Sequence, residues 1–237
     1  MKKFLSFCLL LAVMTAASAQ KFVIQDANAQ IRQVPAFTGV QVSSAIDLYL
    51  SQGEETGVAV SATETAVRDR IKTEVKNGEL HIWFDGQGWN NWRGNKKMKA
   101  YVSIKTIESL KAGGASDIRL MGKITADKLS VDLSGASDMS GELTCNQLDM
   151  DLGGASDLTL VGNIGSTSIR LNGASSVKGW GLVTDYCEID AGGASSAKVI
   201  VNKELKVKAG GASDVAYRGE GVIKEMKSSG ASSITRK

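Results

Sequence analysis

The second half of the chain repeats one tetrapeptide seven times at nearly even spacing. Each copy reads Gly-Ala-Ser followed by Asp or Ser, and successive copies start 21, 19, 19, 20, 18 and 19 residues apart. The copies begin at Gly114, Gly135, Gly154, Gly173, Gly193, Gly211 and Gly230. A fixed period of this kind is typical of an array in which each repeat packs mainly against its neighbours. The sequence therefore predicts a solenoid.

Apolar and polar side chains alternate around each tetrapeptide. In the third copy the apolar residues Leu148, Met150 and Leu152 occupy every second position, which we call the apolar parity. The polar residues Asp149 and Asp151 occupy the positions between them. Strict alternation indicates extended chain with one buried face. In every copy the Gly and the first Ser fall on the apolar parity, so this serine is expected to point inward. A helix cannot produce this register.

Two architectures could use strands at this spacing. A meander or sandwich would place Asn-Gly or Asp-Gly turns between its strands, but Asn77-Gly78 and Asp85-Gly86 both precede the repeat. In a parallel β-helix each repeat is one coil, and equivalent residues stack about 4.8 Å apart. The repeat length suits a narrow triangular coil of three short strands. We therefore predict an all-β parallel β-helix over residues 111–237, with coils of about 19 residues. Stacking of the glycines also predicts that Gly154→Val lowers thermal stability.

Residues 37–110 are less regular and are expected to form irregular β coils or a cap at one end of the solenoid. Ser44-Ala45-Ile46-Asp47 reads as a degenerate first copy of the repeat. The pattern predicts a helix over 63–73 and strands over 79–84 and 99–104. A polar loop that contains two tryptophans, residues 85–97, separates these two strands.

The N-terminus has the features of a secretory signal peptide. Lys2 and Lys3 precede an apolar run over 4–14, and the small residues Ala17-Ser18-Ala19 precede Gln20. We expect cleavage after Ala19, which leaves residues 20–36 as an N-terminal leader. The apolar run is shorter than the roughly 20 residues of a membrane-spanning helix, and no later segment is apolar enough to span. The mature protein is therefore expected in the periplasm, on the cell surface or outside the cell.

Composition leaves little material for catalysis, metal binding or nucleic-acid binding. Removing the two lysines with the signal peptide lowers the formal charge from +3 to +1, so nothing favours a nucleic-acid partner. The only histidine is His81, expected to be a surface or partly buried structural residue. No base is available to activate the inward serines of the seven copies. We call them the serine column; they are Ser116, Ser137, Ser156, Ser175, Ser195, Ser213 and Ser232. Cys145 and Cys187 have different offsets from the tetrapeptides and are expected to be buried free thiols. We predict no catalytic residue, metal or cofactor.

Two features are candidate binding sites. Asp117, Asp138 and Asp157 occupy equivalent positions of successive copies, where they could hold a cation or sugar hydroxyls, or could bond local backbone amides instead. The loop residues Trp89, Trp92 and Arg93 could bind a ligand, because exposed aromatic and arginine side chains favour binding. Alternatively, a tryptophan of this loop could cap the open core. Trp180, between two glycines, is expected in a surface turn.

The signal peptide, the stretch from Phe37 to Leu50 and the tandem Gly-Ala-Ser-Asp copies resemble the "putative auto-transporter adhesin, head GIN domain" family over roughly 37–237. The resemblance implies a right-handed parallel β-helix and an adhesin-like role, with no catalytic residue to carry over. We therefore expect a non-enzymatic secreted or cell-surface protein that binds a glycan, a matrix protein or an envelope partner. The alternatives are a structural, oligomer-forming envelope protein and a polysaccharide-cleaving β-helix enzyme. The enzyme would need a carboxylate cluster that the sequence does not reveal.

Overall fold

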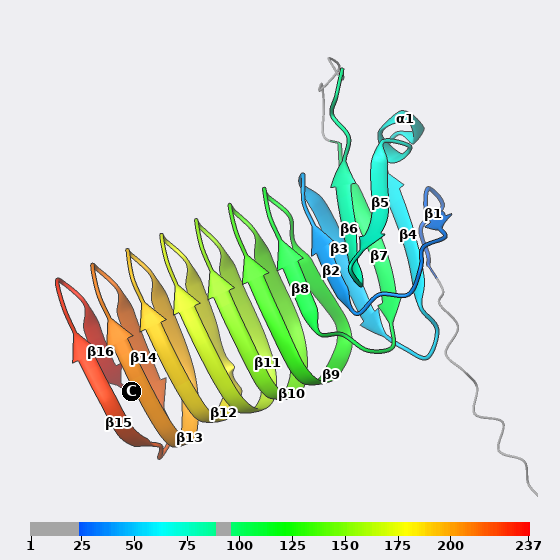
Figure 1. The fold of residues 1–237 in the computed structure, drawn as a ribbon. Helices are drawn as coiled ribbons and strands as arrows, with labels where there is room; N and C mark the ends of the chain where they lie inside the picture. Colours follow the sequence, from blue (N-terminus) through cyan, green and yellow to red (C-terminus); the bar gives the residue numbers. More distant parts are fainter. Residues whose placement is uncertain (1–23, 89–95) are drawn as a thin grey trace, which may run out of the picture.

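The computed structural model describes residues 24–88 and 96–237 and shows a parallel β-helix of about seven turns (Figure 1). Each coil rises on the near side in Figure 1, crosses at a tight turn and descends on the far side as the chain advances toward its C-terminus. This path is right-handed. The predicted fold class and the coil length of about 19 residues are confirmed.

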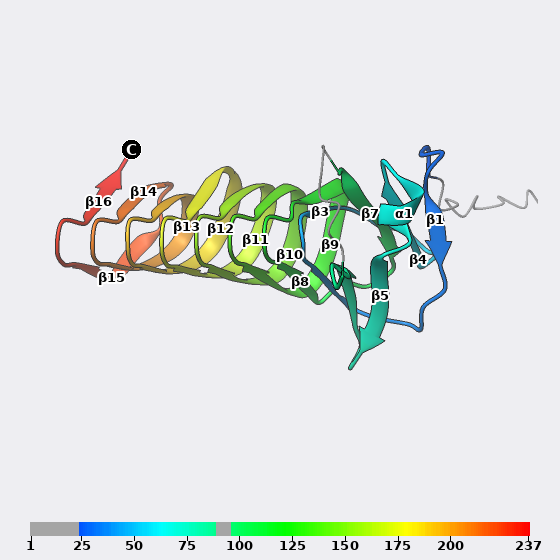
Figure 2. The ribbon, with the colours of Figure 1, turned by 90° about the horizontal axis from the view of Figure 1, so that it is seen from above.

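Long strands that bend once build the regular coils. They are β9 (Ile118–Leu133), β10 (Asp138–Leu152), β11 (Asp157–Leu171), β12 (Ser176–Ala191) and β13 (Ser196–Ala209). The first half of each strand belongs to one sheet and the second half to the other, and Figure 2 shows the two sheets facing each other. The expected triangular coil of three short strands is wrong. A gap in the strand pairing at Asn146 separates the two halves of β10, but the strand itself continues from Asp138 to Leu152, so one strand serves both sheets.

Antiparallel strands make the N-terminal part less regular. β2 (Gly39–Val42), β3 (Ile46–Gln52) and β8 (Ser109–Ala112) continue the two parallel sheets, and β7 (Met98–Ile104) pairs with β3. β4 (Gly57–Ala62) then pairs antiparallel with β7, and β1 (Gln30–Arg32) pairs antiparallel with β4. On the other sheet, a hairpin of β5 (Ile71–Lys76) and β6 (Glu79–Phe84) joins β2.

The helix predicted over 63–73 is mostly wrong. Only Thr65–Arg68 is helical, as α1, and the chain is already extended at Ile71. Cross-strand pairing with β6 outweighs the short helical pattern, and positive φ at Asn77 (51°) and Gly78 (77°) closes the hairpin. The strand predicted over 79–84 matches β6, and the one predicted over 99–104 lies in β7.

The tetrapeptide forms the tight turn between the two sheets. At Gly154 φ is 73°, and the amide of Ala155 donates to the carbonyl of Gly135 one coil earlier, at 2.7 Å. Ser156 is fully buried, and its hydroxyl donates to the carbonyl of Gly153 at 2.9 Å. The degenerate first copy joins the same stack, because the amide of Ile46 donates to the hydroxyl of Ser116 at 3.1 Å. The inward direction predicted for the serine column is confirmed.

The C-terminal coil is the last layer of the array. β14 (Asp214–Arg218) and β16 (Ser233–Arg236) extend the sheet of first halves, and β15 (Val222–Ser228) extends the sheet of second halves. Among the described residues, β15 pairs with β13 alone and β16 pairs with β14 alone. Each sheet therefore ends in a strand with one unpaired edge.

Candidate functional site

The predicted ligand-binding residues Trp89, Trp92 and Arg93 lie outside the described residues. The chain on either side of them is anchored to the N-terminal part. The guanidinium of Arg70 donates to the carbonyls of Asp85 and Gln87 at 3.1 and 2.9 Å. On the other side Lys96 forms a 2.6 Å ion pair with Glu64.

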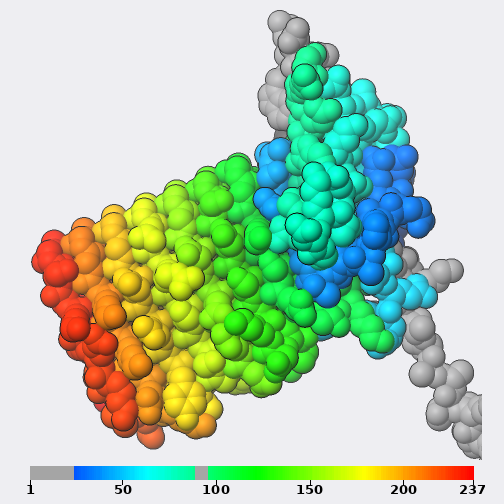
Figure 3. All heavy atoms as spheres, in the orientation of Figure 1, coloured from blue at the N-terminus to red at the C-terminus, as the bar shows by residue number. Residues whose placement is uncertain are grey.

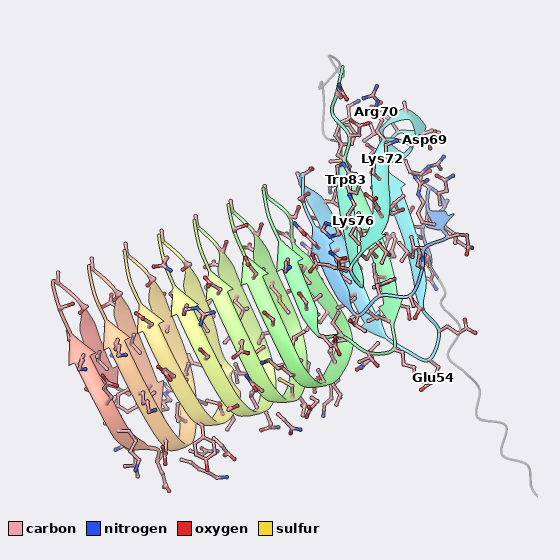
Figure 4. All side chains as sticks on the ribbon, in the orientation of Figure 1. Glu54, Asp69, Arg70, Lys72, Lys76 and Trp83 are labelled. Atoms are coloured by element: carbon pink, nitrogen blue, oxygen red, sulfur yellow. The ribbon has the colours of Figure 1, made fainter. Side chains whose placement is uncertain are left out.

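The β5–β6 hairpin, which precedes this loop in the sequence, presents a further aromatic residue. Trp83 is half-buried on β6, and its cross-strand neighbour on β5 is the exposed Lys72; Figure 4 labels both. His81 is partly buried, as predicted, with its Nε2 atom 3.4 Å from a carboxylate oxygen of Glu79. The prediction for Trp180 is wrong, because it lies within β12 rather than in a turn. A register shift in β12 places it half-buried under Arg218, whose guanidinium carbon is 4.3 Å from the ring centroid.

The three stacked aspartates, Asp117, Asp138 and Asp157, form bonds with the backbone and with basic side chains. The amide of Asp157 donates to a carboxylate oxygen of Asp138 at 3.3 Å, one of the backbone bonds considered from the sequence. Asp157 also pairs with Lys178 at 2.6 Å, and Asp117 pairs with Arg119 at 3.4 Å. Within residues 24–88 and 96–237, no group of three or more His, Cys, Asp or Glu side chains is arranged to hold a metal ion.

Asp117→Asn is expected to raise the free energy of unfolding at pH 7 by less than about 1 kcal/mol, since the site is partly exposed. Burial, followed by the charges of Asp47 and Asp138, raises the pKa of Asp117. A folded-state pKa above the unfolded one means that the ionised carboxylate costs stability, and that this cost disappears as pH falls through the folded-state pKa. Urea denaturation at neutral pH and at a pH below the ordinary aspartate pKa should show the gain only at neutral pH. Asp132→Asn, at an exposed aspartate of β9, the strand that begins directly after Asp117, is the control. A neutral-pH loss specific to Asp117→Asn would contradict the expectation.

Burial of the two cysteines is expected to make their thiols unreactive. Cys145 and Cys187 are buried and unpaired, as predicted. Burial, with a smaller contribution from nearby carboxylates, raises their pKa values to about 11 and about 12. At pH 8 a thiol reagent is therefore expected to leave folded protein of residues 20–237 unlabelled and to label both cysteines in urea. Rapid labelling of the native protein would contradict this burial.

A groove of about 250 Å³ lies along the second halves of β10 to β13, and we call it the Tyr186 groove. Its outward side chains form two rows across the four strands. The rows are Gln147, Ser166, Tyr186 and Glu204, and then Asp149, Ser168, Glu188 and Lys206. β11 supplies a small serine to both rows, so the surface is low between the longer side chains of β10 and β12.

Buried and surface contacts hold the groove in shape. Thr167 donates to Thr184 at 3.0 Å, and the hydroxyl of Thr184 donates to the carbonyl of Tyr186 at 3.0 Å, which fixes the backbone beneath the ring. Tyr186 is 46% exposed, with the ammonium of Lys203 5.4 Å from the centroid of its ring. The amide of Gln147 donates to Asp149 at 2.9 Å. This groove was not predicted from the sequence. The usable signal is a tyrosine at an outward position where the neighbouring coils have Gln147, Ser166 and Glu204.

Most of the inward serine hydroxyls bond to the backbone of the turn. The hydroxyls of Ser156, Ser175 and Ser213 donate to backbone carbonyls at distances of 2.8 to 3.2 Å. Ser195 is an exception, because its buried hydroxyl has no hydrogen-bond partner. In the same described residues, no helix is long and apolar enough to cross a membrane.

Comparisons with known proteins agree with this fold. A family profile described as "Putative auto-transporter adhesin, head GIN domain" matches residues 36–221. A "putative adhesin" structure from Bacteroides fragilis is 19% identical, with a TM-score of 0.78, covering 88% of this chain and 95% of that one. A "putative adhesin" from Parabacteroides merdae (16% identity, TM-score 0.68) covers 88% and 95%. A "putative lipid binding protein" from Parabacteroides distasonis (15% identity, TM-score 0.66) covers 89% and 97%. No curated protein sequence matches the chain.

Proposed function

Because the chain belongs to the family described as "Putative auto-transporter adhesin, head GIN domain", we propose that it is an exported, non-enzymatic adhesin-like protein that binds a saccharide in the Tyr186 groove. The observation that carries the proposal is an exposed tyrosine ring in a shallow hollow lined by carboxylates, an amide and hydroxyls. The signal peptide predicted over residues 1–19 supports export to the periplasm, the cell surface or the medium.

The chemistry of the groove suits a polyhydroxylated ligand. Asp149, Glu188 and Glu204 accept hydrogen bonds, Gln147 both donates and accepts, and Lys206 donates. The tyrosine adds a flat apolar surface with a polar tip, which can lie against the carbon–hydrogen face of a sugar ring. A volume of about 250 Å³ is slightly below the range of ordinary small-molecule pockets, so a short segment of a glycan is the expected occupant.

The described residues support a binding role over catalysis. Of the groove carboxylates, Asp149 is already engaged by Gln147 and by Lys128, which lies at 3.4 Å. The groove thiol belongs to Cys187, whose raised pKa disfavours the reactive thiolate. Trp89, Trp92 and Arg93 remain a second proposed contact surface for a glycan or an envelope protein.

The test is binding of residues 20–237 to an array of glycans and extracellular-matrix proteins. Tyr186→Ala is expected to weaken glycan binding about tenfold, which corresponds to about 1.4 kcal/mol, whereas Tyr186→Phe retains the ring and most of the affinity. Ser166→Trp should fill the hollow and also reduce binding. Met121→Ala, a change at an exposed apolar residue away from the groove, is the control.

The outcomes separate the alternatives. Binding that survives Tyr186→Ala and Ser166→Trp but disappears in Trp89→Ala/Trp92→Ala would move the site to the loop. Binding of basic polypeptides without any glycan would replace the saccharide by a protein partner, because the groove carries three carboxylates and one lysine.

A further inference from the structure

The C-terminal end of the solenoid exposes positions that are core positions in every earlier coil. Ile223 and Met226 on β15 align with Leu205 and Val207 on β13, which are fully buried. Ile223 and Met226 are each 43% exposed, and the neighbouring Val222 is 60% exposed. Figure 3 shows this last coil, in red, as one end of the molecule. An end of this kind combines apolar surface with unpaired strand edges, which favour pairing with another chain.

We propose that this end binds a second copy of the same chain, and that the two copies form a symmetric dimer in which β15 pairs antiparallel with β15 of the partner. A twofold axis brings the same surface of both copies together and closes the assembly. The N-terminal end is a poor partner for the C-terminal end, because it finishes in antiparallel strands, a hairpin and α1. The match between two C-terminal ends is therefore better than a head-to-tail contact.

The charge pattern of β15 in one copy is complementary to that of β15 in an antiparallel second copy. Glu225 and Lys227 flank Met226 and align with the outward residues Lys206 and Lys208 of β13. In an antiparallel pair centred on Met226, each Glu225 lies opposite the partner's Lys227, and the two methionines meet on the core side. Lysines on a free edge ordinarily oppose pairing, but here a glutamate from the other copy faces each Lys227. Opposite charges directly across a strand pair stabilise it.

The experiment is the oligomeric state of residues 20–237 by light scattering after gel filtration, over a range of protein concentrations. The wild type is expected to be a dimer. Glu225→Lys and Lys227→Glu each place like charges opposite one another and should weaken dimerisation at least tenfold, whereas the double variant should restore it. Met226→Lys should also give a monomer. Met121→Lys and Asp132→Lys, at exposed positions away from this end, should remain dimeric.

Circular dichroism melting shows that each variant is folded before its mass is interpreted. A monomeric wild type at every concentration would overturn the proposal. So would a dimer that resists Met226→Lys and both charge reversals, since it would use another surface. A double variant that stays monomeric would overturn the antiparallel pairing about Met226. Tyr186→Ala should leave the mass unchanged, so a failure of the saccharide proposal is distinguishable from a failure of this one.

Discussion

Gly154→Val is expected to lower the free energy of unfolding by between about 2 and 5 kcal/mol. A branched residue at a φ of 73° costs about 1–2 kcal/mol, and overpacking typically adds about 1–3 kcal/mol. The steric cause is direct: a Cβ atom on Gly154 would lie 2.3 Å from the carbonyl oxygen of Gly135 in the previous coil. That carbonyl accepts the bond from Ala155, so it cannot move away without loosening the stack.

The neighbouring glycine supplies the control. A Cβ atom on Gly153 would have nothing within 4 Å, apart from its chain neighbours. Gly153→Ala is therefore expected to change the free energy of unfolding by less than about 1 kcal/mol. Urea denaturation followed by circular dichroism measures both variants. Equal stability of Gly154→Val and the wild type would contradict the stacked turn.

Leu160→Ala is expected to cost about 2–5 kcal/mol of unfolding free energy, because Leu160 is fully buried between the sheets and its removal leaves a cavity. The next residue in the chain, Val161, is 46% exposed, and Val161→Ala should change stability by no more than about 0.5 kcal/mol. Together, these two variants test which of the two adjacent side chains points into the core and which points outward. A larger loss from Val161→Ala than from Leu160→Ala would reverse that assignment.

Strict repetition explains why the array could be predicted from the sequence. Alternation around Leu148 to Leu160 defines the buried face, and the recurring Gly-Ala-Ser defines where the chain turns. A parallel β-helix, in which equivalent residues of successive coils stack, accounts for both the alternation and the recurring turn. The same reasoning correctly placed the inward serines and the buried thiols of Cys145 and Cys187.

The features that escaped prediction depend on contacts between segments. The continuation of one strand through both sheets, past the pairing gap at Asn146, depends on register with the neighbouring coils, which periodicity along one chain does not contain. Residues 71–73 belong to the predicted helix, but pairing with β6 makes them the start of the strand β5. The Tyr186 groove requires the small side chains of β11 to lie beside the large ones of β12, and this comparison across strands is available only once the register is known. The candidate residues Trp89, Trp92 and Arg93 stay a prediction.

Parallel stacking also makes the length of the molecule a variable that evolution can adjust separately from the rest of its architecture. Each coil rests on the one before it through the same glycine turn and the same columns of side chains. Duplication of one 19-residue unit would therefore lengthen the solenoid by about 4.8 Å, the spacing between neighbouring strands. Loss of one unit would shorten it by the same step. The distance from the N-terminal part to the last coil is thus set by a count of tandem units in the gene.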